Sequence, residues 1–218
     1  MAENSEKYIP ALGYAPFTRF YDLVVGLTTR EATFKKELIA QASPTENSKV
    51  LDVACGTGTL ILLLKINCPN ATVIGIDGDS TILEIARKKI KKAGASIQLD
   101  KGFSNNLPYG DGEFDIVMSS LFFHHLSSEM KKKTAEEMFR VIRPGGMIHI
   151  ADWGKPDNKL MSLLFYSIQL LDGFKNTDDN RKGLLPEIFK SAGFDEVKTQ
   201  KSFSTIFGTM VLYSGKKN

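Results

Sequence analysis

The sequence predicts an α/β protein built on a doubly wound, mostly parallel sheet of seven strands with a reversed terminal strand. From residue 48 onward, strand-like and helix-like segments alternate, and the connections between them are short. Such alternation favours a parallel sheet that helices cover on both faces. The chain has 218 residues and a hydrophobic content of 42%, which is enough for one well-buried domain. We expect no separate second domain.

The alternating part contains segments of two kinds. The expected strands are rich in Val, Ile and Leu, whereas the expected helices carry apolar residues at helix-face spacing. The last helix should stop at Pro144-Gly145-Gly146, because proline and glycine end a helix. The expected strands are 49–54, 72–77, 96–101, 114–119 and 147–152, and the expected helices are 58–66, 80–92 and 128–142.

The end of the chain follows a different pattern. Residues 184–192 are expected to form a helix, and residues 194–204 and 208–214 are expected to form two strands. The link between these strands is too short for a helical crossover, although pattern alone does not distinguish antiparallel from parallel pairing. The count of strands is therefore seven.

Two segments lie outside the alternation. We expect residues 1–46 to form an N-terminal helical cap, with a helix over 29–41, on a core formed by residues 47–218. Residues 153–182 are expected to be a helical lid insertion that contains an apolar helix over 160–174. This helix can pack on the core as a lid, line an apolar pocket, lie on a membrane surface or form a homodimer contact.

Composition limits the classes of function. The formal net charge is +3, and the lysine-rich runs 88–92 and 131–133 each fall on an expected helix, which favours a solvated helical face over a nucleic-acid patch. Cys55 and Cys68 have no metal-binding spacing, so we expect neither a disulfide framework nor a metal site. The N-terminus has no apolar signal core, and the apolar runs are too short to span a bilayer. We therefore expect a cytoplasmic protein.

The most informative segment is Val50–Gly58, a strand followed by a glycine turn, with Asp77 nineteen residues after Gly58 at the end of the next expected strand. Glycines allow the backbone to approach a ligand closely. A carboxylate at the next strand end can accept hydrogen bonds from both hydroxyls of a ribose. This order of parts predicts a site for a cofactor that contains a nucleoside.

Three motifs resemble those of class I S-adenosylmethionine-dependent methyltransferases, in the expected order. Residues 51–58 (LDVACGTG) are similar to the first motif of that family. Residues 107–117 and 140–146 are similar to an LPF-x-D-x-x-FD-x-V run and an L-[KR]-PGG turn of its ubiquinone/menaquinone C-methyltransferase-like subgroup. The resemblance covers roughly residues 40–215. It implies the Rossmann-like methyltransferase fold, S-adenosylmethionine as methyl donor and S-adenosylhomocysteine as product.

The resemblance also assigns roles in the donor site. Ala54, Cys55, Gly56 and Gly58 form the turn that leaves room for the amino-acid part of the donor. Asp52 is expected to receive the donor's ammonium group, often through water. Alternatively, its carboxylate holds the turn by accepting backbone N–H bonds.

The ribose and adenine are expected to lie near the second strand. Asp77 should bind the ribose hydroxyls, Gly78 should let the backbone pass beside the sugar, and Ile82 should cover the adenine. The alternative for Asp77 is a simple helix N-cap.

A nicotinamide dinucleotide is the main competitor for this site. The dinucleotide fingerprint GxGxxG has a third glycine, and Ile61 occupies that position here. A dinucleotide site also has no need of an acid at Asp52. Both features favour S-adenosylmethionine.

Other parts of the donor site depart from the subgroup or are less specific. Phe103 stands where relatives usually carry an acid that binds the adenine amino group, so backbone groups at Phe103 and Ser104, or Asn105, are expected to bind adenine instead. Ser119, at the end of the fourth strand, should lie beside the methionine part of the donor. Tyr21 matches a tyrosine that closes over the donor, or it is an ordinary core residue of the cap.

His124, His125 and Asp152 are the candidate catalytic residues. They follow the fourth expected strand or end the fifth, next to Trp153. Methyl transfer from a sulfonium depends mainly on positioning, and it needs a base only when the acceptor must lose a proton. The alternative is that the histidines cap or pack the loop.

The acceptor is constrained mostly by exclusion. Residues 119–122 (SSLF) lack the prolines of the [NDS]PP[YF] motif that is typical of enzymes that methylate amino groups of nucleic-acid bases, and neither cysteine follows a proline as DNA cytosine methylation requires. We therefore expect a small-molecule or lipid-like acceptor and no nucleic acid. A regulatory module that binds S-adenosylmethionine or a nucleoside without catalysis remains the alternative.

Overall fold

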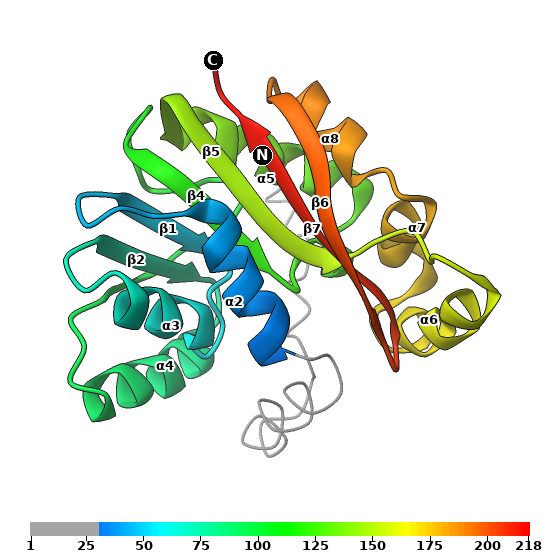
Figure 1. Cartoon of the computed structure of the whole chain (residues 1–218), viewed down its shortest axis with the longest axis horizontal. Helices are drawn as coiled ribbons and strands as arrows, with labels where there is room; N and C mark the ends of the chain where they lie inside the picture. Colours follow the sequence, from blue (N-terminus) through cyan, green and yellow to red (C-terminus); the bar gives the residue numbers. More distant parts are fainter. Residues whose placement is uncertain (1–30) are drawn as a thin grey trace, which may run out of the picture.

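The protein is a seven-stranded sheet with helices on both faces (Figure 1). A computed structural model describes residues 31–218. The strand order is β3-β2-β1-β4-β5-β7-β6, in which the strands from β3 to β5 are parallel and β7 is antiparallel to both of its neighbours. The predicted fold class, with its reversed strand, is confirmed.

In the parallel half of the sheet, the observed strands lie close to the predicted ones. The strands of this half are β1 (Lys49–Val53), β2 (Thr72–Asp77), β3 (Gln98–Lys101), β4 (Phe114–Ser120) and β5 (Ile142–Trp153). β5 begins five residues earlier than predicted, because the Pro144-Gly145-Gly146 segment lies in an irregularity of the β4–β5 ladder rather than before the strand. β1 lies at the centre of this half, between β2 and β4, so its carboxyl end adjoins the ends of both neighbours.

Alternate residues along the strands point to opposite faces of the sheet, and each face has its own core. On one face, Val50 packs with α2 (Glu31–Ala42), α3 (Thr59–Asn67) and α4 (Ser80–Lys92). On the other face, Leu51 packs with α5 (Ser128–Val141) and α8 (Leu185–Ser191). The two layers of helices position every loop at the carboxyl edge of the parallel strands.

The last two strands, β6 (Asp195–Thr205) and β7 (Gly208–Lys216), form a long hairpin that α6 (Lys159–Asp172) and α7 (Phe174–Lys182) accompany at one end (Figure 1). The predicted apolar helix over 160–174 corresponds to α6, which ends two residues earlier than predicted, and α7 follows it after one residue. Gly173, with φ 89°, separates them, because this backbone conformation suits glycine and interrupts the helix. The sequence pattern did not predict α7.

The α6 helix has two unlike faces. Met161, Phe165 and Ile168 are buried against the sheet, so the helix packs on the core. The other face exposes large apolar side chains, with Leu163, Leu170 and Leu171 between 65% and 74% accessible. No helix in the described part of the chain is long and apolar enough to cross a bilayer.

The proposed division of the chain into a cap, a core and a lid remains a prediction. In the region assigned to the cap, only α2 and the segment after it fall among the described residues, and α2 contributes Phe34 and Leu38 to the core. Residues 153–182 hold α6 and α7, where the lid was placed.

Candidate active site

Three residues of the turn after β1 adopt left-handed backbone conformations. Ala54, Gly56 and Gly58 have φ values of 58°, 55° and 77°. Glycine adopts this conformation at little cost, whereas Ala54 carries strain there. Gly58 N–H donates to the carbonyl of Cys55 at 3.0 Å, and Cys55 N–H donates to that of Ile76 at 3.0 Å. The turn is therefore compact and anchored to β2.

Asp77 holds this turn in place. Its carboxylate accepts hydrogen bonds from Gly56 N–H at 3.0 Å and from Asp79 N–H at 2.9 Å. The helix N-cap is Asp79, whose carboxylate accepts from Thr81 and Ile82 N–H, so the N-cap interpretation of Asp77 is wrong. A carboxylate offers about four lone-pair sites. The Asp77 carboxylate thus retains acceptor capacity for ribose hydroxyls.

Asp52, unlike Asp77, is buried without hydrogen-bond partners among the described residues. Its side chain is 2% exposed, and neither carboxylate oxygen has a hydrogen-bond partner within residues 31–218. Burial raises its pKa from an ordinary 3.8 to about 7, although the charge of Lys35 lowers it. The alternative that Asp52 clamps the turn is wrong, since Asp77 makes those bonds. An unpartnered buried carboxylate is costly, and a cationic ligand group would compensate it.

The expected adenine end is formed by Gly78, Ile82 and the segment after β3. A β-carbon at Gly78 would lie 2.8 Å from the ring of Phe103, so glycine permits this close approach. The Phe103 side chain is 52% exposed, which leaves a ring surface available to a ligand. The Ser104 hydroxyl shares a 2.8 Å hydrogen bond with Thr134, so its side chain already has a partner.

Ser119 and Tyr21 complete the expected donor residues. Ser119 is fully buried, and its hydroxyl donates to the Val53 carbonyl at 2.7 Å, so the side chain ties β4 to β1 beneath the turn. Its backbone contribution to the donor site remains a prediction. Tyr21 lies outside the described residues.

A polar cluster stands beyond the end of β4. His124 and His125 lie in the short helix η2 (Phe123–His125), and their rings stack with centroids 4.0 Å apart. The Nδ1 atom of His124 is 2.8 Å from Asp152, and the Nδ1 atom of His125 is 3.2 Å from Asp172 on α6. Burial and the neighbouring His124 lower the pKa of His125, which favours its neutral form.

Asp152 is the buried centre of this cluster. Its side chain is inaccessible and accepts backbone N–H bonds from Phe122, Phe123 and Trp153, besides its contacts with His124 and Asn180. Burial alone would raise the pKa of Asp152, but His124 and the N–H donors outweigh it and hold the pKa below its ordinary value. Asp152 therefore orients the histidine loop, and Trp153, at 2% exposed, is a core residue rather than a pocket wall.

Asp172 was missed by sequence reasoning. It stands 47 residues after His125 at the end of α6, and it belongs to none of the recognised motifs. Only the packing of α6 and α7 against the sheet and η2 brings its carboxylate to the histidines.

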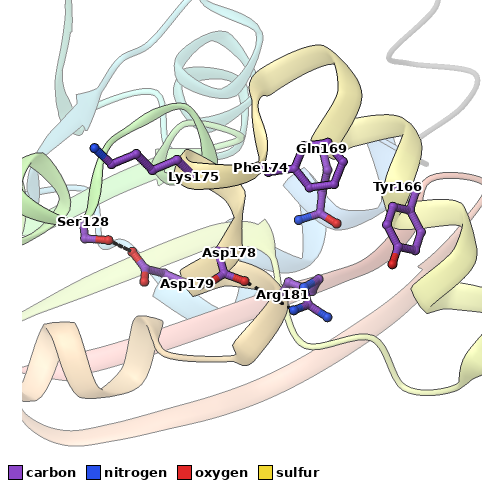
Figure 2. A pocket seen from close by; sticks show the side chains of 8 residues that line it. All are labelled: Ser128, Tyr166, Gln169, Phe174, Lys175, Asp178, Asp179 and Arg181. Atoms are coloured by element: carbon purple, nitrogen blue, oxygen red, sulfur yellow. Dashed lines mark hydrogen bonds and ion pairs between the residues drawn. The ribbon is translucent and has the colours of Figure 1, made fainter.

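A pocket of about 450 Å³ opens between α6 and α7 (Figure 2). Tyr166 and Phe174 contribute aromatic rings to it, while Ser128 donates a hydrogen bond to Asp179 at 2.6 Å across one end. None of the donor-site residues lines it. The pocket is lined by Ser128, Tyr166, Gln169, Phe174, Lys175, Asp178, Asp179 and Arg181.

Comparison with known proteins agrees with this geometry. Residues 50–146 match the family described as "Methyltransferase domain". A demethylmenaquinone methyltransferase of Staphylococcus saprophyticus is 30% identical over 204 residues, which cover 85% of each protein. The chain belongs to the S-adenosylmethionine-dependent methyltransferases. S-Adenosylmethionine is accordingly the donor of this methyltransferase, and S-adenosylhomocysteine is the product.

Other relatives agree on the family and the fold. A demethylmenaquinone methyltransferase of Thermus thermophilus is 29% identical over 147 residues, which cover 66% of each protein, so about a third of that relative lies outside the match. The crystal structure of a putative methyltransferase from Bacillus halodurans superposes with a TM-score of 0.68 at 21% identity, covering 84% of this chain and 98% of that one. An S-adenosylmethionine-dependent methyltransferase from Aquifex aeolicus gives 0.67 at 21% identity, covering 96% and 99%.

The residues of this methyltransferase fit its donor. The unpartnered carboxylate of Asp52 suits the ammonium group of S-adenosylmethionine, and the remaining acceptor sites of Asp77 suit two hydroxyls. In the free protein, the folded environment of Asp52 opposes its charge.

The substitution Asp52→Asn tests this role through stability and pH. In the free protein, the pKa of Asp52 is raised above its unfolded value, so the stability it contributes is present below about pH 4 and is lost as pH rises to about 7. Asp52→Asn should therefore increase the free energy of unfolding above pH 7, by about 4 kcal/mol at 1.36 kcal/mol per pKa unit. Urea unfolding at pH 4 to 8 measures this difference.

As pH rises, the affinity of the wild type for S-adenosylhomocysteine should increase, whereas the contribution of Asp52 to its free energy of unfolding decreases. The wild type should bind more tightly as pH rises through 7, whereas Asp52→Asn should bind weakly at every pH. Asp79→Asn removes a nearby charge but keeps a good N-cap, and it should leave both affinity and pH dependence unchanged. Equal affinity of Asp52→Asn and wild type would refute the ammonium role.

Proposed function

We propose that this methyltransferase acts on a small, lipid-like aromatic acceptor that carries a hydroxyl group, of the quinol class. The observation that carries the proposal is the polar cluster of His124, His125 and Asp172 next to a helix with an exposed apolar face. A quinol has the matching chemistry, with polar ring hydroxyls and an apolar tail. The name of the relatives, demethylmenaquinone methyltransferase, supports the same class of acceptor.

The donor residues have separate proposed tasks. When bound, S-adenosylmethionine supplies a methyl group that is activated by its positive sulfur. Asp52 compensates the ammonium charge, Asp77 accepts the ribose hydroxyls, and Gly78, Ile82 and Phe103 border the adenine. These contacts orient the donor toward the end of β4, where the histidines begin.

We assign the histidine cluster to removing the proton of the acceptor hydroxyl. A phenolic hydroxyl becomes a strong electron donor to its ring when its proton is lost, so the site must promote that loss. The His125 side chain is 27% exposed and so is accessible to a ligand, whereas the side chain of His124 is 4% exposed and held by Asp152. We assign His125 to direct contact with the acceptor, and His124 and Asp152 to its positioning.

The exposed face of α6 would give an apolar acceptor a route to the site. Leu163, Leu170 and Leu171 stand on this face, and Asp172 of the polar cluster directly follows Leu171. We propose that this face contacts a membrane surface, where quinols with apolar tails reside. An apolar helix face at an interface gains free energy in proportion to the apolar area it buries.

An acceptor screen tests the proposed function. The full chain is incubated with S-adenosylmethionine and, in turn, a chemically reduced prenylated naphthoquinone, a catechol, a small amine, a carboxylic acid and single-stranded nucleic acid. We expect methylation of the naphthoquinol, measured by mass spectrometry. Turnover on a different acceptor class would overturn the quinol proposal, and donor binding without turnover on any acceptor would support the regulatory module instead.

Substitution of His125 tests the polar cluster. His125→Asn should lower kcat by roughly 10²- to 10⁴-fold, because assisted proton removal contributes about that much, while the affinity for S-adenosylhomocysteine should not change. Lys190→Ala, an exposed change on α8, serves as the control. A kcat equal to that of the wild type would remove His125 from the mechanism.

Vesicle sedimentation tests the membrane contact. The double substitution Leu170→Glu and Leu171→Glu should abolish co-sedimentation with phosphatidylglycerol vesicles, because both side chains are more than 70% exposed and would be charged. Ile66→Glu, which changes a 64% exposed residue on α3, should have no effect. If the wild type does not bind vesicles and the double substitution abolishes dimers that light scattering detects in the wild type, the face is instead a homodimer contact.

A further inference from the structure

Three side chains with metal-binding atoms converge where the loop after β4 faces the end of α6. His124, His125 and Asp172 each place one such atom within 4.8 Å of the others. The Nδ1 atom of His125 lies 3.2 Å from one oxygen of Asp172, and the Nε2 atom of His124 lies 3.7 Å from the other. We propose that these three residues bind a divalent transition-metal ion, of which Zn²⁺ is the most suitable.

The separations suit one shared ion. Bonds of about 2.0–2.2 Å from zinc to nitrogen or oxygen place tetrahedral ligand atoms roughly 3.3–3.5 Å apart. The two histidine nitrogens lie 3.2 Å and 3.7 Å from different oxygens of the Asp172 carboxylate, and both distances are near this spacing. All three ligand atoms lie within 4.8 Å of one another, so side-chain rotation can bring them to these separations.

The surroundings of His124 are those of a metal ligand. Its Nδ1 atom donates to Asp152, and this bond leaves the lone pair of Nε2 available on the side of Asp172. Histidines that bind metals almost always give their other ring nitrogen to such a carboxylate or carbonyl, which fixes the ring and strengthens the ligand. Asp152 is itself fixed by three backbone N–H groups.

The chemistry of the ligand atoms determines which metal ion the site prefers. Two imidazole nitrogens with one carboxylate suit Zn²⁺, Co²⁺ or Fe²⁺, whereas Mg²⁺ and Ca²⁺ prefer oxygen ligands throughout. Three protein ligands also leave at least one coordination position open, as in catalytic rather than structural zinc sites. The side chains of His125 and Asp172 are 27% and 20% exposed, so an ion can enter from solvent.

Such an ion would connect two distant parts of the chain. The histidines belong to the loop after β4 and Asp172 belongs to α6, so the ion would fasten the helix to the edge of the sheet. With the ion bound, His125 would act on the acceptor through the ion, because an acceptor hydroxyl at the open position would lose its proton more easily when the ion stabilises the oxyanion. This last step rests on the proposed function, but binding of the ion does not. The spacing of the two cysteines predicted no metal site, because these three ligands belong to no cysteine pattern.

Cobalt binding by the full chain tests the site without donor or acceptor. After treatment with a chelator and its removal, Co²⁺ is titrated into the wild type, and we expect one equivalent to produce visible absorption that Zn²⁺ displaces. Asp172→Asn and His125→Asn should each weaken binding by roughly 100-fold or more, since even partners of the ligands contribute 10- to 100-fold. Asp178→Asn removes an acid from the neighbouring helix α7 and should bind like the wild type.

Two further measurements keep the outcome decisive. Zn²⁺ should raise the melting temperature of the wild type and of Asp178→Asn, but not of Asp172→Asn, and circular dichroism checks that each variant is folded. In NMR spectra of the wild type, bound Co²⁺ should shift the ring signals of His124 and His125 more than those of His149. Absence of Co²⁺ binding at millimolar concentration, or unaltered binding by folded Asp172→Asn, would overturn the proposal. Metal binding together with no quinol methylation would overturn the proposed function alone.

Discussion

The proposed donor site depends on a carboxylate that the protein buries without compensating its charge. Asp52 lies in the central strand of the parallel half, 2% exposed, and its oxygens have no hydrogen-bond partner among the residues described. This arrangement costs folding free energy in the free protein, as its raised pKa indicates. The same arrangement gives a cationic ligand group a strong, poorly screened interaction. Asp52 thus lowers the stability of the free protein and favours the binding of a cationic group.

The rest of the site follows from the position of that strand. β1 lies between β2 and β4, so the glycine turn, Asp77 and the loop of His124 and His125 all emerge at one edge of the sheet. Asp77 accepts the Gly56 N–H bond of this turn, and Asp52 makes no hydrogen bond to it.

Local sequence signals predicted most of this frame. The predicted limits of β2 and α4 match those observed, because Asp77 and Asp79 mark the end of one and the start of the other. The long-range features were not predictable. Asp172 reaches the histidines only through the packing of α6 and α7, which no local pattern encodes. Likewise, no local pattern indicated that Asp77 rather than Asp52 accepts the backbone N–H bond of the glycine turn.

The most direct test of this account is the pKa of Asp52, measured by carboxyl NMR in the free protein and in the complex with S-adenosylhomocysteine. We expect a pKa of about 7 in the free protein, and a fall of at least one unit when the ammonium group binds beside the carboxylate. An ordinary value near 4 in the free protein, or a raised value that the ligand leaves unchanged, would contradict it.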